Sequence, residues 1–321
     1  MKVATLPGFT DSGDLVIEDA PVPRPGPHEV LIRVAAAGVN RADVLQKRGL
    51  YPSPPGSPAW PGLEVAGVIE EVGEGVTEWS AGHRVCALLP GGGYGEYAVC
   101  NSSLVLPTPS GISDVEAAAL PEAACTVWSN LRAGGFPGID SVLVHGGSGG
   151  IGTTAIQLGK ALGLTVFVTA GGEERARRCG QLGADLAVDY RSQDFVAAVR
   201  ERGGVDMVLD CVGRDYLANN LEVLRDDGTL VIIGLQSGAK AEINLGTVLS
   251  KRLTVAGTTL RSRPLAQRAA IVASVHEHVW PLVPTAVRPV IHDVFSLKDV
   301  NAAHRALESG EVFGKVVLSV G

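Results

Sequence analysis

A glycine-rich segment near the middle of the chain has residue types and spacing that could hold a dinucleotide. Residues 146–152 read GGSGGIG, and Gly147, Gly149 and Gly152 match the spacing GxGxxG. The first glycine allows a tight turn, the second lets the backbone approach a pyrophosphate, and the third lets a helix pack closely on a strand. A predicted strand at 141–145 and a predicted helix at 151–162 flank the segment, and this context favours dinucleotide binding over a purely structural turn. We expect six consecutive residues to contact the cofactor: Gly147, Ser148, Gly149, Gly150, Ile151 and Gly152.

The end of the next predicted strand indicates which dinucleotide is preferred. Folds that prefer NAD place an Asp or Glu there, about 20 residues after the glycines, to bind the ribose 2′-hydroxyl. Here the strand at 165–169 is followed by the neutral residues Ala170, Gly171 and Gly172, and the following helix carries Arg175, a cation suited to a 2′-phosphate. NADPH is therefore expected. The alternative is that Arg175 belongs to a solvated arginine-rich helix face, where the neighbouring glutamates weaken the positive field.

Two regions with different patterns must position these residues. Short strands separated by glycine and proline are predicted up to about residue 120, at 30–34, 65–69, 84–89 and 95–99. From about residue 114 helices and short apolar strands alternate, which predicts a parallel sheet covered on both faces. Strand-like segments return after about residue 285. We therefore expect an α/β protein with a β-rich domain of residues 1–120, rejoined by 285–321, and a doubly wound nucleotide-binding domain of residues 121–284.

Composition limits the partners and the compartment. The 321 residues carry a formal net charge of -7, and the basic residues do not cluster, which disfavours a nucleic-acid partner. No window approaches 18 uninterrupted apolar residues, so we expect no membrane span, and we expect no signal peptide. The five cysteines are widely separated with no CxxC pair, which indicates buried thiols in a reducing compartment. A cytoplasmic protein is expected.

Several further segments resemble one known family, the medium-chain dehydrogenase/reductases. Residues 62–73, GLEVAGVIEEVG, resemble the family's GHExxGxVxxVG stretch, and residues 81–85, AGHRV, resemble its AGDRV turn. Residues 93–97, GYGEY, resemble a third segment. The resemblance covers essentially the whole chain, and it implies a GroES-like catalytic domain joined to a Rossmann nucleotide-binding domain.

Zinc alcohol dehydrogenases of this family use a cysteine and the histidine of GHE as two of the catalytic zinc ligands. Asn40 stands here where the cysteine would be, and Leu63 stands where the histidine would be. Leucine cannot ligate zinc, and an amide oxygen is a poor substitute for a thiolate. The four-cysteine loop of a structural zinc is also missing from the sequence. We therefore expect no metal site, and reduction of an already electrophilic acceptor in place of alcohol oxidation.

The most specific match is to zeta-crystallin-type quinone oxidoreductases. Residues 38–52, GVNRADVLQKRGLYP, resemble their GVNRAD signature, and residues 121–131 and 260–263 resemble two further segments of that family. The resemblance implies hydride transfer from NADPH to a quinone and a homodimer formed through the nucleotide-binding domains. It places Asn40, Tyr51 and Thr126 around the nicotinamide and the acceptor, and it assigns these further residues to the cofactor: Gly171, Arg175, Tyr190, Leu235, Leu260, Arg261 and Lys315. The family usually has lysine at position 175 and serine at position 172, so one phosphate hydrogen bond is in question.

Alternatives remain open at this stage. Tyr51 could pack within a proline-rich loop, and Asn40 could be a turn residue that satisfies backbone groups. An NADPH-dependent alkenal or enone reductase would use the same zinc-free scaffold. A binding protein of the zeta-crystallin kind, structural or RNA-binding, is a rival of another class, although the acidic charge argues against RNA.

Overall fold

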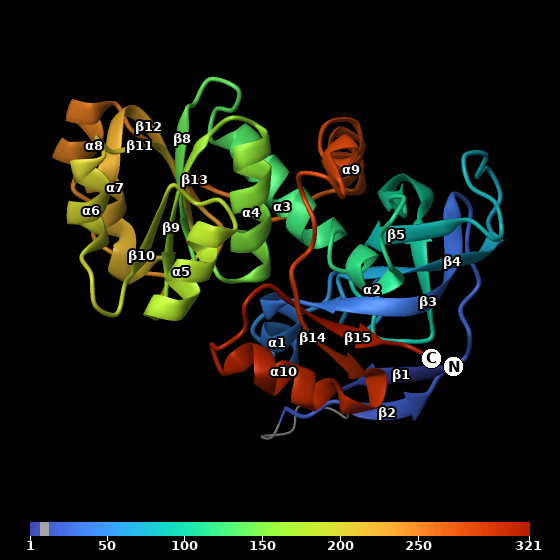
Figure 1. Ribbon diagram of the computed structural model, residues 1–321. Helices are drawn as coiled ribbons and strands as arrows, with labels where there is room; N and C mark the ends of the chain where they lie inside the picture. The colour runs from blue at the N-terminus through green and yellow to red at the C-terminus, as the bar shows by residue number, and fades with distance from the viewer. Residues whose placement is uncertain (7–12) are drawn as a thin grey trace. The chain divides into compact units, whose positions relative to one another are not determined.

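The computed structural model describes residues 1–6 and 13–321, and these form two compact units (Figure 1). Unit 1 contains Met1–Cys125 and Leu260–Gly321, and unit 2 contains Thr126–Thr259. The boundary between the end of unit 2 and the C-terminal part of unit 1 therefore lies at 259/260, about 25 residues before the expected boundary at 284/285. The reason is that helix α9 (Leu265–His278) packs against η1 (Ser102–Leu104) and β7 (Val105–Pro107) of unit 1, and the Trp280 indole donates a hydrogen bond to the Pro107 carbonyl at 2.8 Å.

Unit 2 is built on a six-stranded parallel sheet. Its spatial order is β10-β9-β8-β11-β12-β13, which is the order 3-2-1-4-5-6 of a Rossmann fold. The expected doubly wound sheet is confirmed. The strands are β8 (Ser141–His145), β9 (Thr165–Ala170), β10 (Leu186–Asp189), β11 (Val205–Asp210), β12 (Leu224–Ile232) and β13 (Thr254–Gly257).

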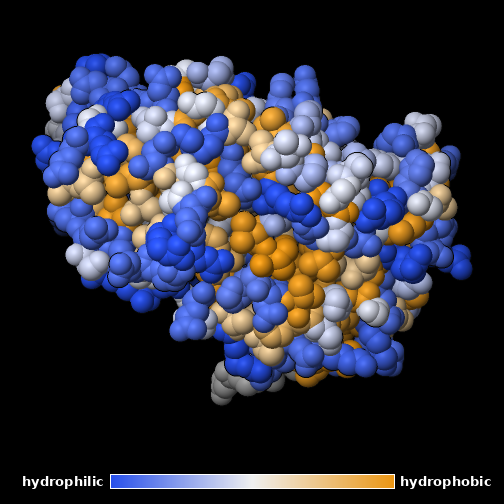
Figure 2. Space-filling view, in the orientation of Figure 1, coloured by the Kyte–Doolittle hydropathy of each residue, from blue (hydrophilic) through white to orange (hydrophobic). Residues whose placement is uncertain are grey.

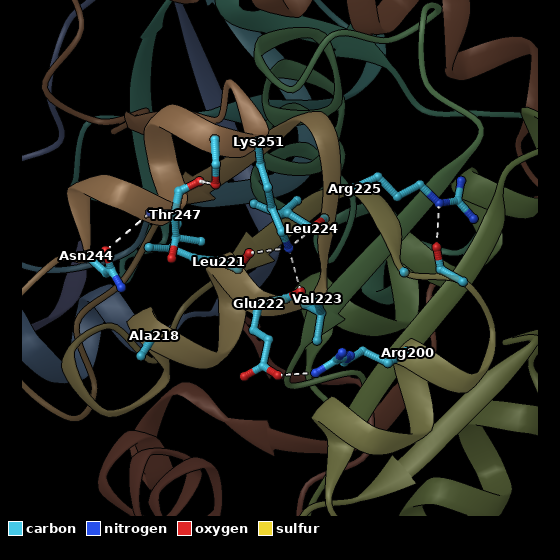
Figure 3. A pocket seen from close by; sticks show the side chains of 13 residues that line it. Arg200, Ala218, Leu221, Glu222, Val223, Leu224, Arg225, Asn244, Thr247 and Lys251 are labelled. Carbon is cyan, nitrogen blue, oxygen red and sulfur yellow. Dashed lines mark hydrogen bonds and ion pairs between the residues drawn. The ribbon is translucent and has the colours of Figure 1, made fainter.

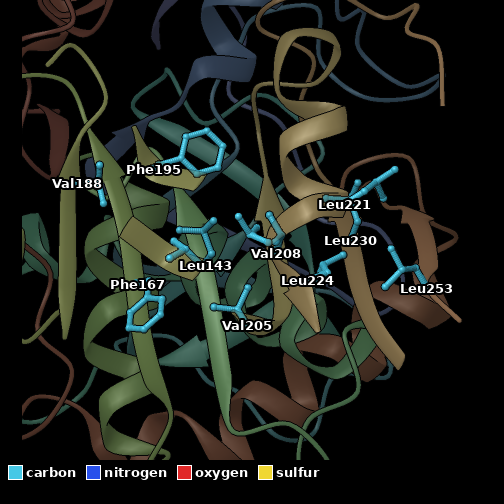
Figure 4. Close-up of a cluster of buried hydrophobic side chains, with 12 residues drawn as sticks. Leu143, Phe167, Val188, Phe195, Val205, Val208, Leu221, Leu224, Leu230 and Leu253 are labelled. Carbon is cyan, nitrogen blue, oxygen red and sulfur yellow. The ribbon is translucent and has the colours of Figure 1, made fainter. Parts of the chain in front are cut away.

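Helices cover both faces of this sheet (Figure 1). Helices α4 (Gly150–Ala161) and α5 (Glu173–Gln181) lie on one face, and α6 (Phe195–Glu201), α7 (Leu217–Val223) and α8 (Leu245–Lys251) lie on the other, with the short helix η2 (Arg214–Tyr216) before α7. Phe195 from α6 and Leu221 from α7 pack with Leu143 and Val208 of the sheet (Figure 4). Burying each such side chain contributes about 1.5–3 kcal/mol. This packing brings the carboxyl ends of the parallel strands to one edge of the sheet.

Unit 1 contains a seven-stranded sheet and a separate two-stranded antiparallel sheet. The sheet order is β14-β15-β3-β4-β5-β7, with β6 paired to β3. The C-terminal strand β15 pairs antiparallel with β3, and Val316 lies opposite Val39. The remaining strands are β1 (Lys2–Thr5), β2 (Val16–Asp19), β3 (Glu29–Val39), β4 (Glu64–Val72), β5 (Arg84–Leu88), β6 (Tyr97–Asn101), β14 (Ile291–Ser296) and β15 (Lys315–Ser319).

Unit 1 also contains the helices α1 (Arg41–Lys47), α2 (Asp114–Ala117), α10 (Val300–Glu308), η3 (Trp280–Leu282) and η4 (Leu297–Asp299), and the first part of α3 (Pro121–Ala133). A capping box begins α2, because the Ser113 hydroxyl accepts from the Glu116 N–H and the Glu116 carboxylate accepts from the Ser113 N–H. Helix α3 begins in unit 1 and continues into unit 2, so the first division falls inside a helix.

The cysteines are free thiols, as expected from their wide separation in the sequence. Cys86, Cys100, Cys125 and Cys179 are buried free thiols, and Cys211 is half-buried. Hydrophilic residues line most of the outline of the viewed surface, with hydrophobic residues gathered in patches between them (Figure 2). Within residues 1–6 and 13–321, no helix has both the length and the apolar character needed to cross a membrane.

Candidate active site and cofactor site

The three glycines of the central loop are required for three different reasons. A Cβ atom on Gly147 would lie 2.6 Å from Cβ of Val168, and one on Gly152 would lie 2.3 Å from the Gly146 carbonyl oxygen. Both positions therefore exclude any side chain, because β9 and the loop itself are too close. Gly149 occupies the N-cap position of α4, and a Cβ there would meet only the Gly146 oxygen, at 3.5 Å. Gly149 thus leaves open space in front of the helix N-terminus, where a pyrophosphate would lie.

The rest of the loop forms the first turn of α4. Ser148, Gly150 and Ile151 are half-buried, and the Gly147 N–H donates to the Thr169 carbonyl at 2.8 Å, which ties the loop to the end of β9. Among the described residues no side chain caps the N-terminus of α4. Its first N–H groups and the positive end of its dipole are therefore suited to an anion.

A buried histidine supports this loop, and sequence reasoning had not singled it out. His145 ends β8, with Nδ1 3.0 Å from the Thr169 hydroxyl and Nε2 2.7 Å from Oδ1 of Asn220. Burial lowers the pKa of His145 to about 4, so the imidazole is neutral at physiological pH. It links the ends of two strands and a helix directly behind the loop. Its position immediately before the glycines is the only sequence signal for this role.

The predicted 2′-phosphate residues meet at the end of β9. A Cβ atom on Gly171 would lie 2.5 Å from the Tyr190 hydroxyl and 3.2 Å from Nη2 of Arg175, so both side chains converge on this glycine. The Arg175 guanidinium is fixed there because its Nε donates to the Gly171 carbonyl at 2.6 Å, and its Nη2 donates to the same oxygen. Glu174 is paired with Arg177, which reduces its effect on the local field.

A second arginine stands beside them and was missed from the sequence. A Cβ atom on Gly172 would lie 3.7 Å from Nη1 of Arg191 and 3.8 Å from Nη2 of Arg175. Asp189 holds this corner together by accepting from the Gly172 N–H at 2.7 Å and from the Arg191 N–H at 3.0 Å. The hydrogen bond from the Arg191 N–H, followed by that from the Gly172 N–H, keeps the pKa of Asp189 below its usual range. Two guanidinium groups and a tyrosine hydroxyl thus surround the start of α5.

Leu235 follows β12 at the same edge of the sheet as the glycine loop. It is 54% exposed, and a Cβ atom on Gly213 would lie 3.1 Å from its Cδ2 atom. The Cys211 thiol, which directly follows β11, donates to the His145 carbonyl at 3.4 Å and connects the end of β11 to the end of β8. An exposed leucine here is available to a ligand bound over the carboxyl ends of the strands.

In unit 1, three polar side chains meet at one end of three neighbouring strands. Asn40 follows the end of β3, Glu64 begins β4, and Lys315 begins β15. Because β4 and β15 both run antiparallel to β3, the end of β3 lies beside the two starts. The sheet topology therefore brings together residues that are far apart in the sequence.

The three side chains form a buried hydrogen-bonded cluster, which we call the strand-end cluster. The Lys315 ammonium donates to Glu64 Oε1 at 2.5 Å and to Asn40 Oδ1 at 2.6 Å, and the Asn40 amide donates to Glu64 Oε1 at 2.9 Å. The Lys315 side chain is 6% exposed and that of Glu64 is 0% exposed. A Cβ atom on Gly38 would lie 2.3 Å from Glu64 Oε1, so only glycine makes room for the carboxylate. Lys315 was predicted at the border of the cofactor cleft, and its ammonium is committed to this cluster.

This donor set does not fit a zinc ion. Leu63 is buried in the core and offers no lone pair, and the Asn40 oxygen already accepts from the Lys315 ammonium, whose charge would repel a second cation. In the part of the chain that the structure describes, no three His, Cys, Asp or Glu side chains are grouped so that they could hold a metal ion. Metal content itself stays a prediction for analysis of the protein.

Asn40 is the N-cap residue of α1. The Asp43 carboxylate accepts from the Asn40 N–H at 2.8 Å, and it also accepts from the Gly62 N–H and the Tyr94 hydroxyl, each at 3.0 Å. Burial raises the pKa of Asp43 to about 6, against the effect of these hydrogen bonds. The turn is thus held by Asp43, which leaves the Asn40 amide for the strand-end cluster.

Tyr51 is held by Arg261. The Arg261 guanidinium carbon lies 5.2 Å from the centre of the Tyr51 ring, and Nη1 donates to the Tyr51 carbonyl at 3.2 Å. The same guanidinium donates to the Pro90 carbonyl at 2.6 Å and to the Gln46 side-chain oxygen at 2.8 Å. Burial, followed by repulsion from Glu122, raises the pKa of Tyr51. The Tyr51 ring thus contacts Arg261, and Arg261, predicted beside the cofactor, anchors the loop that carries Tyr51. The predicted role of Tyr51 at the acceptor stays a prediction.

Glu122 adds a second carboxyl group near Glu64. Its N–H donates to Glu64 Oε2 at 2.9 Å, so the start of α3 faces the strand-end cluster. Burial raises the pKa of Glu122 to about 8, and repulsion from Glu64 adds to the shift. Both glutamates were missed as site residues, although each lies next to a segment that sequence reasoning had singled out.

The remaining predicted residues belong to different units. Thr126 lies in the part of α3 that belongs to unit 2, where it is half-buried and its carbonyl accepts from the Asn130 amide at 2.7 Å. Leu260 belongs to unit 1 and is 9% exposed. Their predicted roles beside the cofactor stay predictions.

A cavity of about 690 Å³ in unit 2 lies at the opposite edge of the sheet from the glycine loop (Figure 3). Gly204 and Leu224 line it, and they stand at the starts of β11 and β12. Lys251 points toward the end of α7, where it donates to the carbonyls of Leu221, Glu222 and Leu224. Open parallel sheets bind ligands at the carboxyl ends of their strands, so this cavity is not the dinucleotide site.

Comparison with known proteins agrees with this architecture. The alcohol dehydrogenase GroES-like domain family matches residues 26–110, and the family described as zinc-binding dehydrogenase matches residues 150–274. The quinone oxidoreductase of Lama guanicoe is 35% identical over 314 residues, which cover 94% of this chain and 91% of the relative.

Two solved structures are informative. The quinone oxidoreductase from Thermus thermophilus, determined alone and in complex with NADPH, is 33% identical, with a TM-score of 0.85 over 99% of this chain and 100% of that one. A 2-haloacrylate reductase is 28% identical, with a TM-score of 0.84 over 99% of each chain. The chain belongs to the medium-chain dehydrogenase/reductase superfamily. Within it, the chain is an oxidoreductase of the quinone oxidoreductase type.

Proposed function

We propose that this oxidoreductase uses NADPH to reduce quinones by direct hydride transfer, without a metal ion. The observation that carries the proposal is the strand-end cluster, in which the Lys315 ammonium contacts Asn40, the residue at an expected metal-ligand position. A site without a Lewis acid suits an acceptor that is already electrophilic. The similarity to quinone oxidoreductases supports a quinone as that acceptor.

The cofactor is NADPH, and the residues of unit 2 fit it. Gly149 leaves room for the pyrophosphate at the N-terminus of α4, and Arg175, Arg191 and Tyr190 surround the place where a 2′-phosphate would lie. A carboxylate that would bind a free 2′-hydroxyl does not follow β9. When bound, NADPH supplies the hydride.

The chain itself orients the acceptor. Asn40 is fixed on both sides, because its oxygen accepts from Lys315 and its amide nitrogen donates to Glu64. The second amide hydrogen can therefore donate to an acceptor oxygen without reorganisation as negative charge develops there. The Tyr51 hydroxyl is the second candidate donor, and Arg261 holds its ring.

Steady-state turnover with a panel of naphthoquinones, benzoquinones and short enones tests this proposal. We expect oxidation of NADPH with quinones, and a loss of about 10²–10³-fold in kcat when a preorganised donor is removed. Asn40→Ala and Tyr51→Phe therefore form the matched pair of variants. Unchanged kcat/KM in both variants would show that these groups do not contact the acceptor, and stoichiometric zinc in the pure protein would contradict the metal-free mechanism.

Cofactor choice is tested separately with Arg175→Ala. A hydrogen bond to a charged group contributes about 1.5–3 kcal/mol, so the preference for NADPH over NADH should fall by roughly 10- to 100-fold. NADH serves as the internal control, because it lacks the phosphate. An equal loss of affinity for both cofactors would mean that Arg175 stabilises the loop and does not bind the phosphate.

A reductase of alkenals or other electron-poor alkenes is the second candidate, and the similarity to a 2-haloacrylate reductase favours it. The same panel separates the two, because this function requires faster turnover with enones than with quinones. Tight, salt-sensitive RNA binding without turnover of any acceptor would instead support the binding-protein alternative.

We also propose that two copies of the chain pair through unit 2. Strand β13 lies at the edge of the six-stranded sheet, and Val255 on this strand is 40% exposed. Unpaired apolar edge strands are sites of pairing with another chain. Sedimentation of the wild type should give a dimer, and Val255→Lys should give a monomer. A monomeric wild type would refute this proposal.

The expected cytoplasmic location stays a prediction for cell fractionation.

A further inference from the structure

Complete reduction of a quinone requires a proton that the hydride does not bring. The quinone accepts a hydride, which carries two electrons and one proton, and becomes a hydroquinone anion. One more proton is needed to form the neutral hydroquinone. A group that is still protonated at neutral pH and lies beside the acceptor-binding residues is required to supply it efficiently.

We propose that Glu122 is the proton donor for the reduced acceptor, an inference that rests on the proposed quinone reductase function. The geometry places Glu122 at the strand-end cluster, since its N–H donates to Glu64 Oε2 at 2.9 Å. Glu64 in turn accepts from Asn40, the residue proposed to contact the acceptor oxygen. After burial, repulsion from the Glu122 carboxyl group also raises the pKa of Tyr51, so these two residues interact electrostatically.

The two neighbouring glutamates have opposite surroundings. Glu64 is 0% exposed and its carboxylate accepts from three donors, namely the Lys315 ammonium, the Asn40 amide and the Glu122 N–H. Glu122 has no comparable set of donors in the part of the chain that the structure describes, and its side chain is only half-buried. Neighbouring carboxyl groups in different surroundings can take different catalytic roles.

The charges that face Glu122 come from several elements. Glu64 on β4 and Asp43 on α1 repel its anion, whereas Lys315 on β15 and Arg261 attract it. Tyr51 and Cys125 complete the titratable neighbours. Burial is the largest effect, and together these groups raise the pKa of Glu122 to about 8, so the acid form predominates at pH 7.

The proposed step balances in atoms and charge. The acceptor gains the hydride from reduced nicotinamide, and its oxygen becomes an anion. The O–H bond of Glu122 then breaks, an O–H bond forms on the hydroquinone, and Glu122 becomes a carboxylate. A proton from solvent restores the acid before the next turnover.

The pH dependence of kcat tests this inference in the intact protein. For the wild type with a quinone and saturating NADPH, we expect kcat to be constant below pH 7 and to fall above about pH 8, as Glu122 ionises. Glu122→Gln should lower kcat at pH 7 by about 10²–10⁴-fold, the usual contribution of a general acid, and should remove the fall near pH 8. KM for NADPH should stay unchanged, because Glu122 has no role in binding the dinucleotide.

Two further variants separate proton delivery from structure. Glu122→Asp keeps an acid and should recover part of the lost kcat together with the fall at high pH. Glu71→Gln changes an exposed glutamate of β4, outside the site, and should behave as the wild type. The loss caused by Glu122→Gln should also be smaller for electron-poor quinones, since their hydroquinones are stronger acids and depend less on a donor.

The outcomes distinguish this inference from the proposed function. A wild type that reduces quinones with no fall in kcat near pH 8, or a Glu122→Gln variant that keeps the wild-type kcat and pH profile, overturns the role of Glu122 alone. A wild type that oxidises no NADPH with any quinone overturns the proposed function and the inference with it.

Discussion

Removing the Lys315 ammonium should destabilise unit 1 far more than loss of an ordinary ion pair. The variant Lys315→Met keeps most of the side-chain volume but leaves the Glu64 carboxylate, which is 0% exposed, without its counter-charge. Breaking a buried pair by removing one partner costs about 3–5 kcal/mol, because the other charge stays buried and unpaired. The Asn40 amide and the Glu122 N–H remain as donors to Glu64, and they compensate only part of this cost.

Calorimetry provides the assay. For a domain of about 150–250 residues, 1 kcal/mol shifts Tm by roughly 2–4 °C, so the transition of unit 1 should move down by roughly 6–20 °C. The transition of unit 2 should stay in place. The exposed pair Lys2–Asp19 gives the matched control, because Lys2→Met removes an ion pair whose side chains are 51% and 77% exposed and should cost about 1 kcal/mol or less.

A double variant completes the test. Lys315→Met combined with Glu64→Gln leaves no buried unpaired charge, so it should be more stable than Lys315→Met alone. The reasoning is refuted if Lys315→Met unfolds like the wild type, or if the double variant loses the sum of the two single losses.

Three further predictions concern the loop, the clamp on Tyr51 and pH. Gly152→Ala puts a Cβ atom 2.3 Å from the Gly146 oxygen, so the affinity for NADPH should fall by about tenfold or more in a fluorescence titration. Gly180→Ala is the control, because no atom lies within 4 Å of its Cβ and the affinity should stay unchanged. Arg261→Lys loses the planar fork that binds the Tyr51 and Pro90 carbonyls, so KM for the quinone should rise about tenfold with little change in KM for NADPH; equal changes in both would contradict a local role. Because the pKa of Glu122 is raised from 4.5 to about 8, its contribution to stability is present at low pH and is lost as pH rises through about 8. The Tm of Glu122→Gln minus that of the wild type should therefore become more positive between pH 6 and pH 9, and a constant difference would show that Glu122 does not titrate in this range.

Local sequence patterns were sufficient where one element decides the structure. The strand predicted at 141–145 is β8 without change, and the helix predicted at 151–162 differs from α4 by one residue at each end. Apolar runs bounded by glycine specify such elements by themselves. The 260–284 segment was expected in the nucleotide-binding domain because strand-like segments return only after about residue 285, but its helix α9 packs on β7 and η1, which precede it by more than 150 residues. A local pattern does not encode that distant packing.

The same distinction applies to the site. The spacing of Gly147, Gly149 and Gly152 could be interpreted directly, because a single loop performs the function. Glu64 and Glu122 could not be assigned, since their roles arise only when sheet pairing places the start of β4 beside the start of β15 and the start of α3. Arg191 was missed for a similar reason, because it follows β10, and the pairing of β10 with β9 brings it beside Gly172.

The route of the chain through the two units has a consequence for biosynthesis. Unit 2 is one continuous segment, so a ribosome can release all of it as a complete folding unit once residue 259 has left the exit tunnel. Unit 1 stays open at that stage, because β3 and Glu64 wait for a strand whose first residue is Lys315. Until that lysine emerges, a nascent chain holds a finished dinucleotide fold attached to an unfinished unit 1. The order of translation thereby makes the strand-end cluster one of the last parts of unit 1 to be completed.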